Sequence, residues 1–157
     1  MSIIAEVMTR ELQTVSPTAS VLDAAQRMRA SNVGSLPVTV DSRLVGTITD
    51  RDITVRVIAE GRDPASTPVR DAMTTGLYVV RPEQDLTEAE SLMKHHQIRR
   101  LPVVETGGRL VGYVTMATIA REEADEKAVA RMLKGIFQPR TRDSQRFSPK
   151  ARAGAGG

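Results

Sequence analysis

Two polar side chains, Thr49 and Asp52, are the strongest candidates for binding chemistry in this sequence. Thr49 ends a predicted strand and Asp52 lies in the first turn of the predicted helix that follows, so both side chains can point into one cleft. A carboxylate can accept two hydrogen bonds from the vicinal diol of a ribose, and a hydroxyl can donate to a ribose or phosphate oxygen. The free amides of the helix N-terminus favour an anion. The simpler interpretation is that the two residues only cap the helix.

Other residues do not indicate catalysis or a metal site. The sequence lacks a Walker loop, a Gly-x-Gly-x-x-Gly motif and an acid and base on facing elements. The absence of cysteine excludes a disulfide framework and thiolate chemistry. His95 and His96 are adjacent at the predicted end of a helix, which favours a solvated cap over a zinc site. A place for His96 near a phosphate is the less favoured alternative.

The elements that must position Thr49 and Asp52 occur twice. Motifs of the first half recur sixty-five residues later, and sixty-six residues later once a loop has gained one residue. The matched motifs are Met8-Thr9 with Met73-Thr74, Leu36-Pro37-Val38 with Leu101-Pro102-Val103, and Leu44-Val45-Gly46 with Leu110-Val111-Gly112. We therefore predict two copies of one unit.

Each copy has the pattern β-α-β-β-α, which predicts an α+β fold. The expected strands are 13–16, 36–40 and 44–49 in the first copy, and 77–80, 101–104 and 110–115 in the second. Ser20 and Asp85 are expected to open the first helices with capping boxes, and helical spacing places Leu22, Ala25 and Met28 on one buried face. The closing helices are expected at 50–60 and, as one longer helix, at 116–133.

The predicted organisation is a first repeat at 1–61, a linker at 62–70, a second repeat at 71–135 and a tail at 136–157. A unit of about sixty residues buries only roughly 60% of its unfolded surface. Two copies packed sheet to sheet with pseudo-twofold symmetry would bury more, so we expect one module instead of two independent domains.

The signature residues carry a family resemblance. Gly46-Thr47-Ile48-Thr49-Asp50-Arg51-Asp52-Ile53 resembles the CBS-domain signature, and Val33 to Val38 matches the segment upstream of it. The second copy offers Ile98 to Val103 and Gly112-Tyr113-Val114-Thr115. Two copies in register over about residues 3 to 120 resemble a tandem CBS-domain pair, or Bateman module, of the small stand-alone bacterial type.

The resemblance implies a non-enzymatic regulatory module that binds an adenosine-type ligand (AMP, ADP, ATP or S-adenosylmethionine) between the repeats, with no required cofactor. The implied contacts are Thr49, Arg51, Asp52, Val15, Ser35, Leu36 and Pro37 from the first copy, and Val79, Arg99, Arg100, Leu101, Pro102, Thr115 and Thr118 from the second. The arginines would meet phosphates, and the apolar strand residues would enclose a flat base. It also implies a homodimer formed through helices and an unidentified regulated protein. The alternative is an interaction or dimerisation module with weak or no ligand binding.

The second copy departs from this pattern. Thr118 stands at the position of Asp52, and Met116 stands at the position of Asp50. A threonine can offer a diol one weaker hydrogen bond in place of a bidentate charged contact. We therefore expect unequal sites, the fuller one at Thr49 and Asp52.

The charge of the chain is concentrated at its end. The net charge is +3, and residues 138–157 contribute five basic groups against Asp143, which leaves −1 for the rest of the chain. A nucleic-acid partner is therefore not indicated for the folded body, and the glycine-rich basic tail is expected to be disordered. The sequence has no apolar run long enough to cross a bilayer and no secretion signal, so we expect a cytoplasmic protein without membrane contact.

Overall fold

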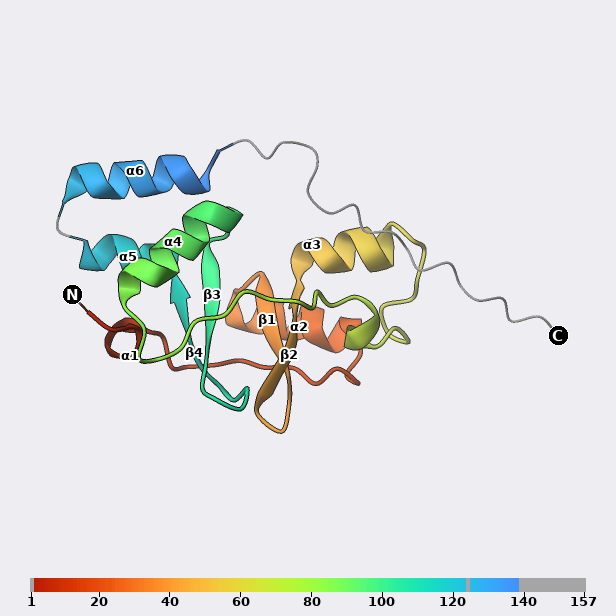
Figure 1. The fold of residues 1–157 in the computed structure, drawn as a ribbon. Coiled ribbons are helices and arrows are strands. Elements are labelled where there is room, and N and C mark those ends of the chain that lie inside the picture. Colours follow the sequence, from red (N-terminus) through yellow and green to blue (C-terminus); the bar gives the residue numbers. More distant parts are fainter. Residues whose placement is uncertain (1, 124, 139–157) are drawn as a thin grey trace.

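The computed structural model describes residues 2–123 and 125–138, which form two similar α+β repeats. Each repeat contains an antiparallel strand pair, β1 (Ser35–Val40) with β2 (Arg43–Thr49) in the first and β3 (Arg100–Val104) with β4 (Leu110–Thr115) in the second (Figure 1). The predicted α+β class and the duplication are confirmed. Of the tail predicted at 136–157, residues 139–157 lie outside the described residues, and Ile136 belongs to a helix.

The expected first strand of each repeat is reduced to a single bridging residue. Val15 pairs in parallel with Val38, and Val80 pairs in the same way with Val103. A proline follows two positions after each of these valines. Because proline has no backbone N–H, it cannot donate the next hydrogen bond of a ladder, and the pairing stops.

The turns of the two hairpins follow their sequence signals. Asp41 and Ser42 have φ values of 50° and 65°, and Gly107 and Gly108 have φ values of 101° and 95°. In the Asp41-Ser42 turn, positive φ at both central residues gives a twist that matches that of the flanking strands, and the longer second turn has glycines at its two positive-φ positions. The hairpins predicted at these positions are confirmed.

The first long helices are α2 (Val21–Ser31) and α4 (Leu86–His96). The Ser20 hydroxyl accepts a hydrogen bond from the Asp23 amide at 3.0 Å, which is half of the predicted capping box. The Asp23 carboxylate accepts from the Arg27 side chain at 2.9 Å. The capping box predicted at Asp85 is wrong, because the Asp85 side chain makes no cap bond and the Glu88 carboxylate instead accepts from the Gln84 side chain at 2.6 Å.

The buried face of α2 differs from the prediction by one position. Val21 and Ala24 are fully buried and Met28 is 6% exposed, whereas Leu22 is 41% exposed. The helix begins at Val21, and the spacing of these three buried residues matches one helical face. Leu22 therefore lies outside the core.

The closing helices differ between the repeats. In the first, α3 (Asp50–Ile53) runs on into a π-helical turn, η1 (Thr54–Ile58), in which the Ala59 amide reaches the Thr54 carbonyl. In the second, the single helix predicted over 116–133 is wrong, since α5 (Met116–Glu122) and α6 (Glu126–Ile136) are separate. Glu123 is extended, and the Asp125 carboxylate caps the new helix at the Lys127 amide. The helix α6 then lies over α4 (Figure 1).

The two hydrophobic cores exchange their leading segments. Ile4 from α1 (Ile4–Val7) and Met8 lie in the core of the second repeat. Val69 from the 3-10 turn η2 (Val69–Asp71) and Ala72 lie in the core of the first. Each leading segment also pairs with the other repeat's sheet, through Thr9 with Tyr113 and Thr74 with Thr47. The repeats are therefore interlocked in one module.

Contacts between equivalent residues mark a pseudo-twofold axis between the hairpins. The Leu44 amide donates to the Gly108 carbonyl at 3.0 Å, and the Leu110 amide donates to the Ser42 carbonyl at 2.9 Å. Leu44 is equivalent to Leu110 and Ser42 to Gly108, so a twofold rotation that exchanges the repeats turns one hydrogen bond into the other. The pseudo-twofold packing predicted from the duplication is confirmed.

Candidate functional site

Thr49 and Asp52 form a reciprocal cap at the start of α3. The Thr49 hydroxyl accepts a hydrogen bond from the Asp52 amide, and the Asp52 carboxylate accepts one from the Thr49 amide, both at 3.0 Å. The alternative that these residues cap the helix is therefore what the structure shows. The cap also fixes both side chains at the junction of β2 and α3.

The Asp52 carboxylate has two further partners that the sequence did not predict. The Thr74 hydroxyl donates to its two oxygens at 3.3 and 3.4 Å, and Arg56 Nη1 lies 3.7 Å from Oδ1. Asp52 is only 8% exposed. Arg56 could have been found from its spacing, four residues after Asp52 on a helix. Thr74 comes from the segment that leads into the other repeat, and no local pattern indicates it.

The equivalent cap of the second repeat is built from hydroxyls. The Thr115 hydroxyl accepts from the Thr118 amide at 3.1 Å, and the two hydroxyl oxygens lie 3.0 Å apart. Thr118 is as buried as Asp52, at 8% exposure. The two positions are thus alike in geometry and differ in charge.

The basic residues predicted to meet phosphates are separated. Arg100 crosses the pseudo-twofold axis, donates to the Ser35 hydroxyl at 2.8 Å and lies over the Tyr113 ring. The Arg99 guanidinium lies over the Phe137 ring at the end of α6. Arg51 is exposed beside the cap.

Most of the apolar residues predicted to enclose a base lie inside the cores. Val15, Leu36 and Leu101 are at most 2% exposed, and the prolines that follow the two leucines, Pro37 and Pro102, are also buried. Val15, Leu36 and Leu101 belong to the two hydrophobic cores, and among all the residues predicted to enclose a base only Val79 is exposed, at 41%.

Tyr78 is an aromatic neighbour that sequence reasoning missed. It is 46% exposed and stacks on the His96 ring, with 3.6 Å between the ring centroids. Tyr78 belongs to the segment 74–80. At one end of this segment the Thr74 hydroxyl donates to the Asp52 carboxylate, and at the other end the Val80 amide donates to the Pro102 carbonyl. Tyr78 and Val79 therefore lie on the connection between the cap and β3. The repeat pattern could not indicate Tyr78, because its equivalent in the first copy is Gln13.

Burial raises the pKa of the Tyr113 hydroxyl above its usual value of 10.0, although a hydrogen bond with Thr47 and the charge of Arg100 act in the opposite direction. Tyr113 and Thr47 occupy equivalent positions in the two repeats. The polar groups at the axis between the repeats are therefore the Tyr113 phenol, the Thr47 and Ser35 hydroxyls and the Arg100 guanidinium. These groups differ in kind although the backbone around them is related by the pseudo-twofold axis.

Two hollows lie on the surface beside these elements. One of about 460 Å³ lies between the end of α2 and the start of α3 and is lined by Met28, Arg29, Asp50 and their neighbours. The other, of about 340 Å³, lies between residues 5–12 and the β3–β4 hairpin. Neither of these two is lined by Thr49 or Asp52, although the first is lined by Asp50 and Ile53, which directly follow them in the chain.

Residues 2–123 and 125–138 hold no group of three or more histidine, cysteine, aspartate or glutamate side chains that could bind a metal ion. They also contain no helix of the length and hydropathy that crossing a bilayer requires.

The chain is similar to stand-alone CBS proteins over nearly its whole length. It is 40% identical to the CBS domain-containing protein YhcV of Bacillus subtilis over 136 residues, which covers 87% of this chain and 96% of the relative. It is 36% identical to hypoxic response protein 1 of Mycobacterium tuberculosis over 135 residues, which covers 85% of this chain and 93% of that protein.

Solved structures show the same similarity. The crystal structure of hypoxic response protein 1, described with two coordinated zinc ions, superposes with a TM-score of 0.70 at 35% identity and covers 78% of this chain and 99% of that one. The structure of CBSX2 in complex with AMP superposes with a TM-score of 0.67 at 32% identity and covers 76% and 94%. The family model of the CBS domain matches residues 4–58 and 69–125. The chain belongs to the CBS domain family, as a tandem pair.

Proposed function

We propose that this CBS pair is a non-enzymatic regulatory module of the cytoplasm that binds an adenosine-type ligand at the Thr49–Asp52 cap. The observation that carries the proposal is the charged cap of the first repeat, in a chain whose relative CBSX2 is described in complex with AMP. In this proposal the Asp52 carboxylate accepts from the ribose diol, and Thr49 and the α3 amides contact a phosphate. Arg51 and Arg100 supply positive charge to the ligand's phosphate, and Tyr78 and Val79 contact its adenine base.

The test is binding of AMP, ADP, ATP and S-adenosylmethionine, each measured by thermal shift and calorimetry. We expect at least one of them to stabilise the wild type. Asp52→Asn keeps the size of the side chain and its capping oxygen but removes the charge. Because hydrogen bonds to a charged group contribute about 1.5–3 kcal/mol, this variant should bind about 10- to 100-fold more weakly.

Thr118→Val is the matched control, because it removes the equivalent polar group in the second repeat. It should change affinity for the same ligand much less than Asp52→Asn does. The proposal fails if none of the four compounds binds at millimolar concentration, or if Asp52→Asn leaves the affinity unchanged.

A second candidate function is an interaction or dimerisation module with weak or no ligand binding. Two observations favour it: the Asp52 carboxylate already has three partners and is 8% exposed, and its equivalent in the second repeat is Thr118. Protein purified without added nucleotide would then carry no absorbing ligand, and the four compounds would give no thermal shift.

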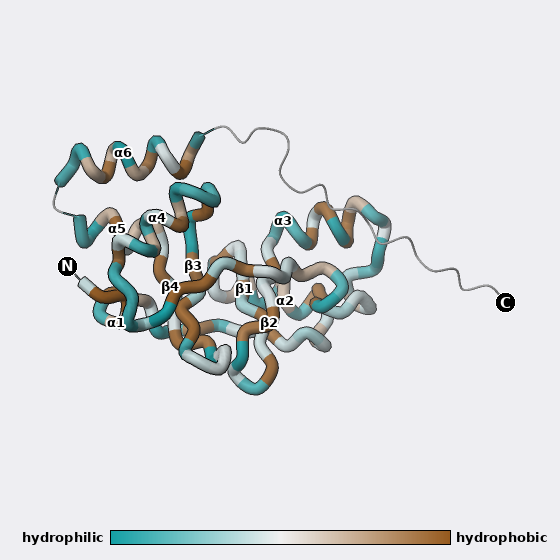
Figure 2. The backbone as a smooth tube through the Cα atoms, in the orientation of Figure 1, coloured by the Kyte–Doolittle hydropathy of each residue, from teal (hydrophilic) through white to brown (hydrophobic). Residues whose placement is uncertain are grey.

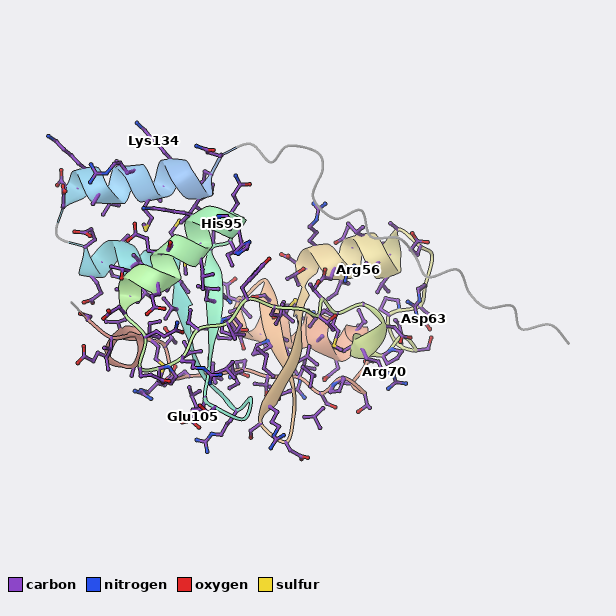
Figure 3. The ribbon with its side chains drawn as sticks, viewed as in Figure 1. Arg56, Asp63, Arg70, His95, Glu105 and Lys134 are labelled. Carbon is purple, nitrogen blue, oxygen red and sulfur yellow. The ribbon has the colours of Figure 1, made fainter. Side chains whose placement is uncertain are left out.

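In either case we propose a homodimer that forms through the helices of the first repeat. Leu22, Val55 and Ile58 are 41%, 45% and 56% exposed on α2 and η1, and Figure 2 shows hydrophobic residues along the outer helical segment labelled α3. In the second repeat α6 covers the corresponding helix α4 and presents charged residues such as Lys134 outward (Figure 3). The positions of Leu22 and Val55 hold Thr87 and Arg121 in the second repeat, so the exposed apolar side chains on the helices of the first repeat favour contact through that repeat.

Light scattering coupled to gel filtration tests this contact. Val55→Glu and Ile58→Glu place a charge in the proposed interface and should convert a dimer into a monomer. Ala130→Glu, on the exposed side of α6, should leave the dimer intact. A wild-type protein that is monomeric at high micromolar concentration would contradict the proposal, as would a dimer that only Ala130→Glu disrupts.

A further inference from the structure

The Asp52 carboxylate is shared between its own helix and the chain segment that enters the second repeat. On the helix side it accepts from the Thr49 amide at 3.0 Å. On the other side the Thr74 hydroxyl reaches both carboxylate oxygens at 3.3 and 3.4 Å. The residue is 8% exposed, so these neighbours leave little of it open to solvent.

Arg56 strengthens the same connection. Its Nη1 atom lies 3.7 Å from Asp52 Oδ1 and donates to the Ala72 and Met73 carbonyls at 3.0 Å and to the Thr74 hydroxyl at 3.3 Å. Figure 3 shows Arg56 on the helical segment that closes the first repeat. One guanidinium therefore ties this helix to three consecutive residues, 72–74, at the start of the crossing segment, residues 72–80, which leads into the second repeat.

The crossing segment connects the cap to the second repeat. Thr74 exchanges two backbone hydrogen bonds with Thr47 of β2, and six residues later Val80 pairs with β3. Tyr78 and Val79 lie between these two anchors and are exposed. A change at Asp52 can thus reach the second sheet through a short stretch of backbone.

The second repeat has no charged counterpart of this cluster. The positions equivalent to Asp52 and Arg56 hold Thr118 and Glu122, and the position equivalent to Thr74 holds Thr9. The Thr118 hydroxyl lies against the Thr115 hydroxyl instead. Only the first repeat therefore has an acid and a base that join its closing helix to the leading segment of the other repeat.

We infer that Asp52, Arg56 and Thr74 form a latch between the repeats that a vicinal diol bound at Asp52 opens. This inference rests on the proposed ligand site and names how that site regulates the module. The single hydroxyl proton of Thr74 is shared between the two carboxylate oxygens, at 3.3 and 3.4 Å, and Arg56 lies 3.7 Å away as an ion pair. A diol that donates to both oxygens of this side chain, in a residue that is only 8% exposed, takes the place of the Thr74 hydroxyl. The ligand shifts the equilibrium between the closed and open latch only by its different affinity for the two states.

The first test measures AMP affinity by calorimetry in Thr74→Val. This change removes the hydroxyl that competes with the diol and keeps the size of the side chain and its backbone pair with Thr47. Loss of one competing neutral hydrogen bond should tighten AMP binding about 2- to 10-fold. Thr9→Val, the equivalent change in the other repeat, should leave the affinity unchanged. Weaker or unchanged binding by Thr74→Val would overturn the latch, because a residue that merely supports the site cannot improve binding when it is removed.

The second test needs no ligand and uses amide hydrogen exchange of residues 72–80. Arg56→Met and Asp52→Asn should each raise exchange in this segment in ligand-free protein, whereas Glu122→Gln should not raise it in residues 7–15. Equal exchange in all of these proteins would overturn the latch. If AMP, ADP, ATP and S-adenosylmethionine all fail to bind the wild type, the proposed function falls, and this ligand-free comparison alone decides whether the latch exists. Where AMP does bind, it should raise exchange of residues 72–80 in the wild type, and a fall in exchange there would contradict the opening.

Discussion

Replacing Gly46 by alanine should destabilise the module, because the crossing segment leaves no room for a methyl group. A Cβ atom at Gly46 would lie 2.9 Å from the Thr74 carbonyl oxygen and 2.9 Å from the Met73 sulfur. That carbonyl accepts from the Thr47 amide at 2.9 Å, and the Thr74 amide donates back to Thr47 at 2.8 Å. The clash is with backbone that is held in place, and it can be relieved only by separating the pair.

The size of the effect follows from these contacts. Overpacking of a well-packed site costs about 1–3 kcal/mol, and weakening two backbone hydrogen bonds adds about 1 kcal/mol each. We expect Gly46→Ala to lower the free energy of unfolding by about 3–5 kcal/mol. Gly112→Ala should behave alike, since its Cβ would lie 2.8 Å from the Thr9 carbonyl oxygen and from the Met8 sulfur.

Urea unfolding followed by circular dichroism measures both variants, with Gly135→Ala as the matched control. A Cβ at Gly135 meets only the flexible Lys94 side chain, at 3.3 Å, and the residue lies inside α6. Alanine in a helix interior is favoured over glycine by about 0.5–1 kcal/mol, so this variant should be neutral or more stable. Unfolding of Gly46→Ala and Gly112→Ala within about 0.5 kcal/mol of the wild type, a change typical of surface substitutions, would refute the close crossing of the segments.

Three further expectations concern stability. Ile136→Ala should lower the free energy of unfolding by about 2–4 kcal/mol, because the Ile136 side chain is 3% exposed in the second core; urea unfolding checks this, and a loss below about 0.5 kcal/mol would mean that α6 does not pack there. Folding raises the pKa of Tyr113, so the folded state retains its proton longer than the unfolded state. The free energy of unfolding should therefore fall as the pH rises above about 10. Measured against pH, it should fall less in Tyr113→Phe than in the wild type. An equal fall in the two proteins would contradict the burial of this phenol. Ser20→Ala should cost about 1 kcal/mol and Asp85→Ala clearly less, because only Ser20 makes a side-chain cap bond; thermal unfolding of the two variants decides, and equal losses would speak against the difference.

Features with local signals could be predicted from the sequence. The hairpin turns depend on residues that tolerate positive φ, and Asp41, Ser42, Gly107 and Gly108 are found there with such values. The Thr49–Asp52 cap depends on a spacing of three residues, which the sequence displays directly. The duplication was visible because the two copies retain proline, glycine and apolar residues in register.

Features that depend on distant parts of the chain could not be predicted in this way. The exchange of leading segments joins Met8 to the second core and Val69 to the first, and the apolar pattern is the same whichever core receives them. For the same reason the sequence did not indicate that Thr74 contacts Asp52. The predicted base contacts carry a related ambiguity: an apolar residue in a strand can line a cleft or fill a core, and Val15, Leu36 and Leu101 lie in cores in this structure.

The break between α5 and α6 is a partial exception, since Asp125 followed by Glu126 resembles a helix start. The helix-forming residues on both sides favoured one continuous helix. Tertiary packing explains the break between the two helices. The chain turns at Glu123, and α6 then places Met132 and Ile136 in the second core, where they are 1% and 3% exposed.

The inequality of the two repeats involves more than the loss of one carboxylate. Placing an aspartate at Thr118 would restore the acid of the cap, but its i+4 neighbour is Glu122, where the first repeat has Arg56. Two carboxylates one helical turn apart repel each other, and at a position as buried as Thr118 the new charge would have no cation in the place where Asp52 has one. The acid, the base and the crossing hydroxyl therefore form one unit, and the repeat that lacks the acid also lacks the base. This correlation is expected if the cluster acts as a whole, and a cap that served only to start a helix would not require it, because Thr115 and Thr118 start α5 without any charge.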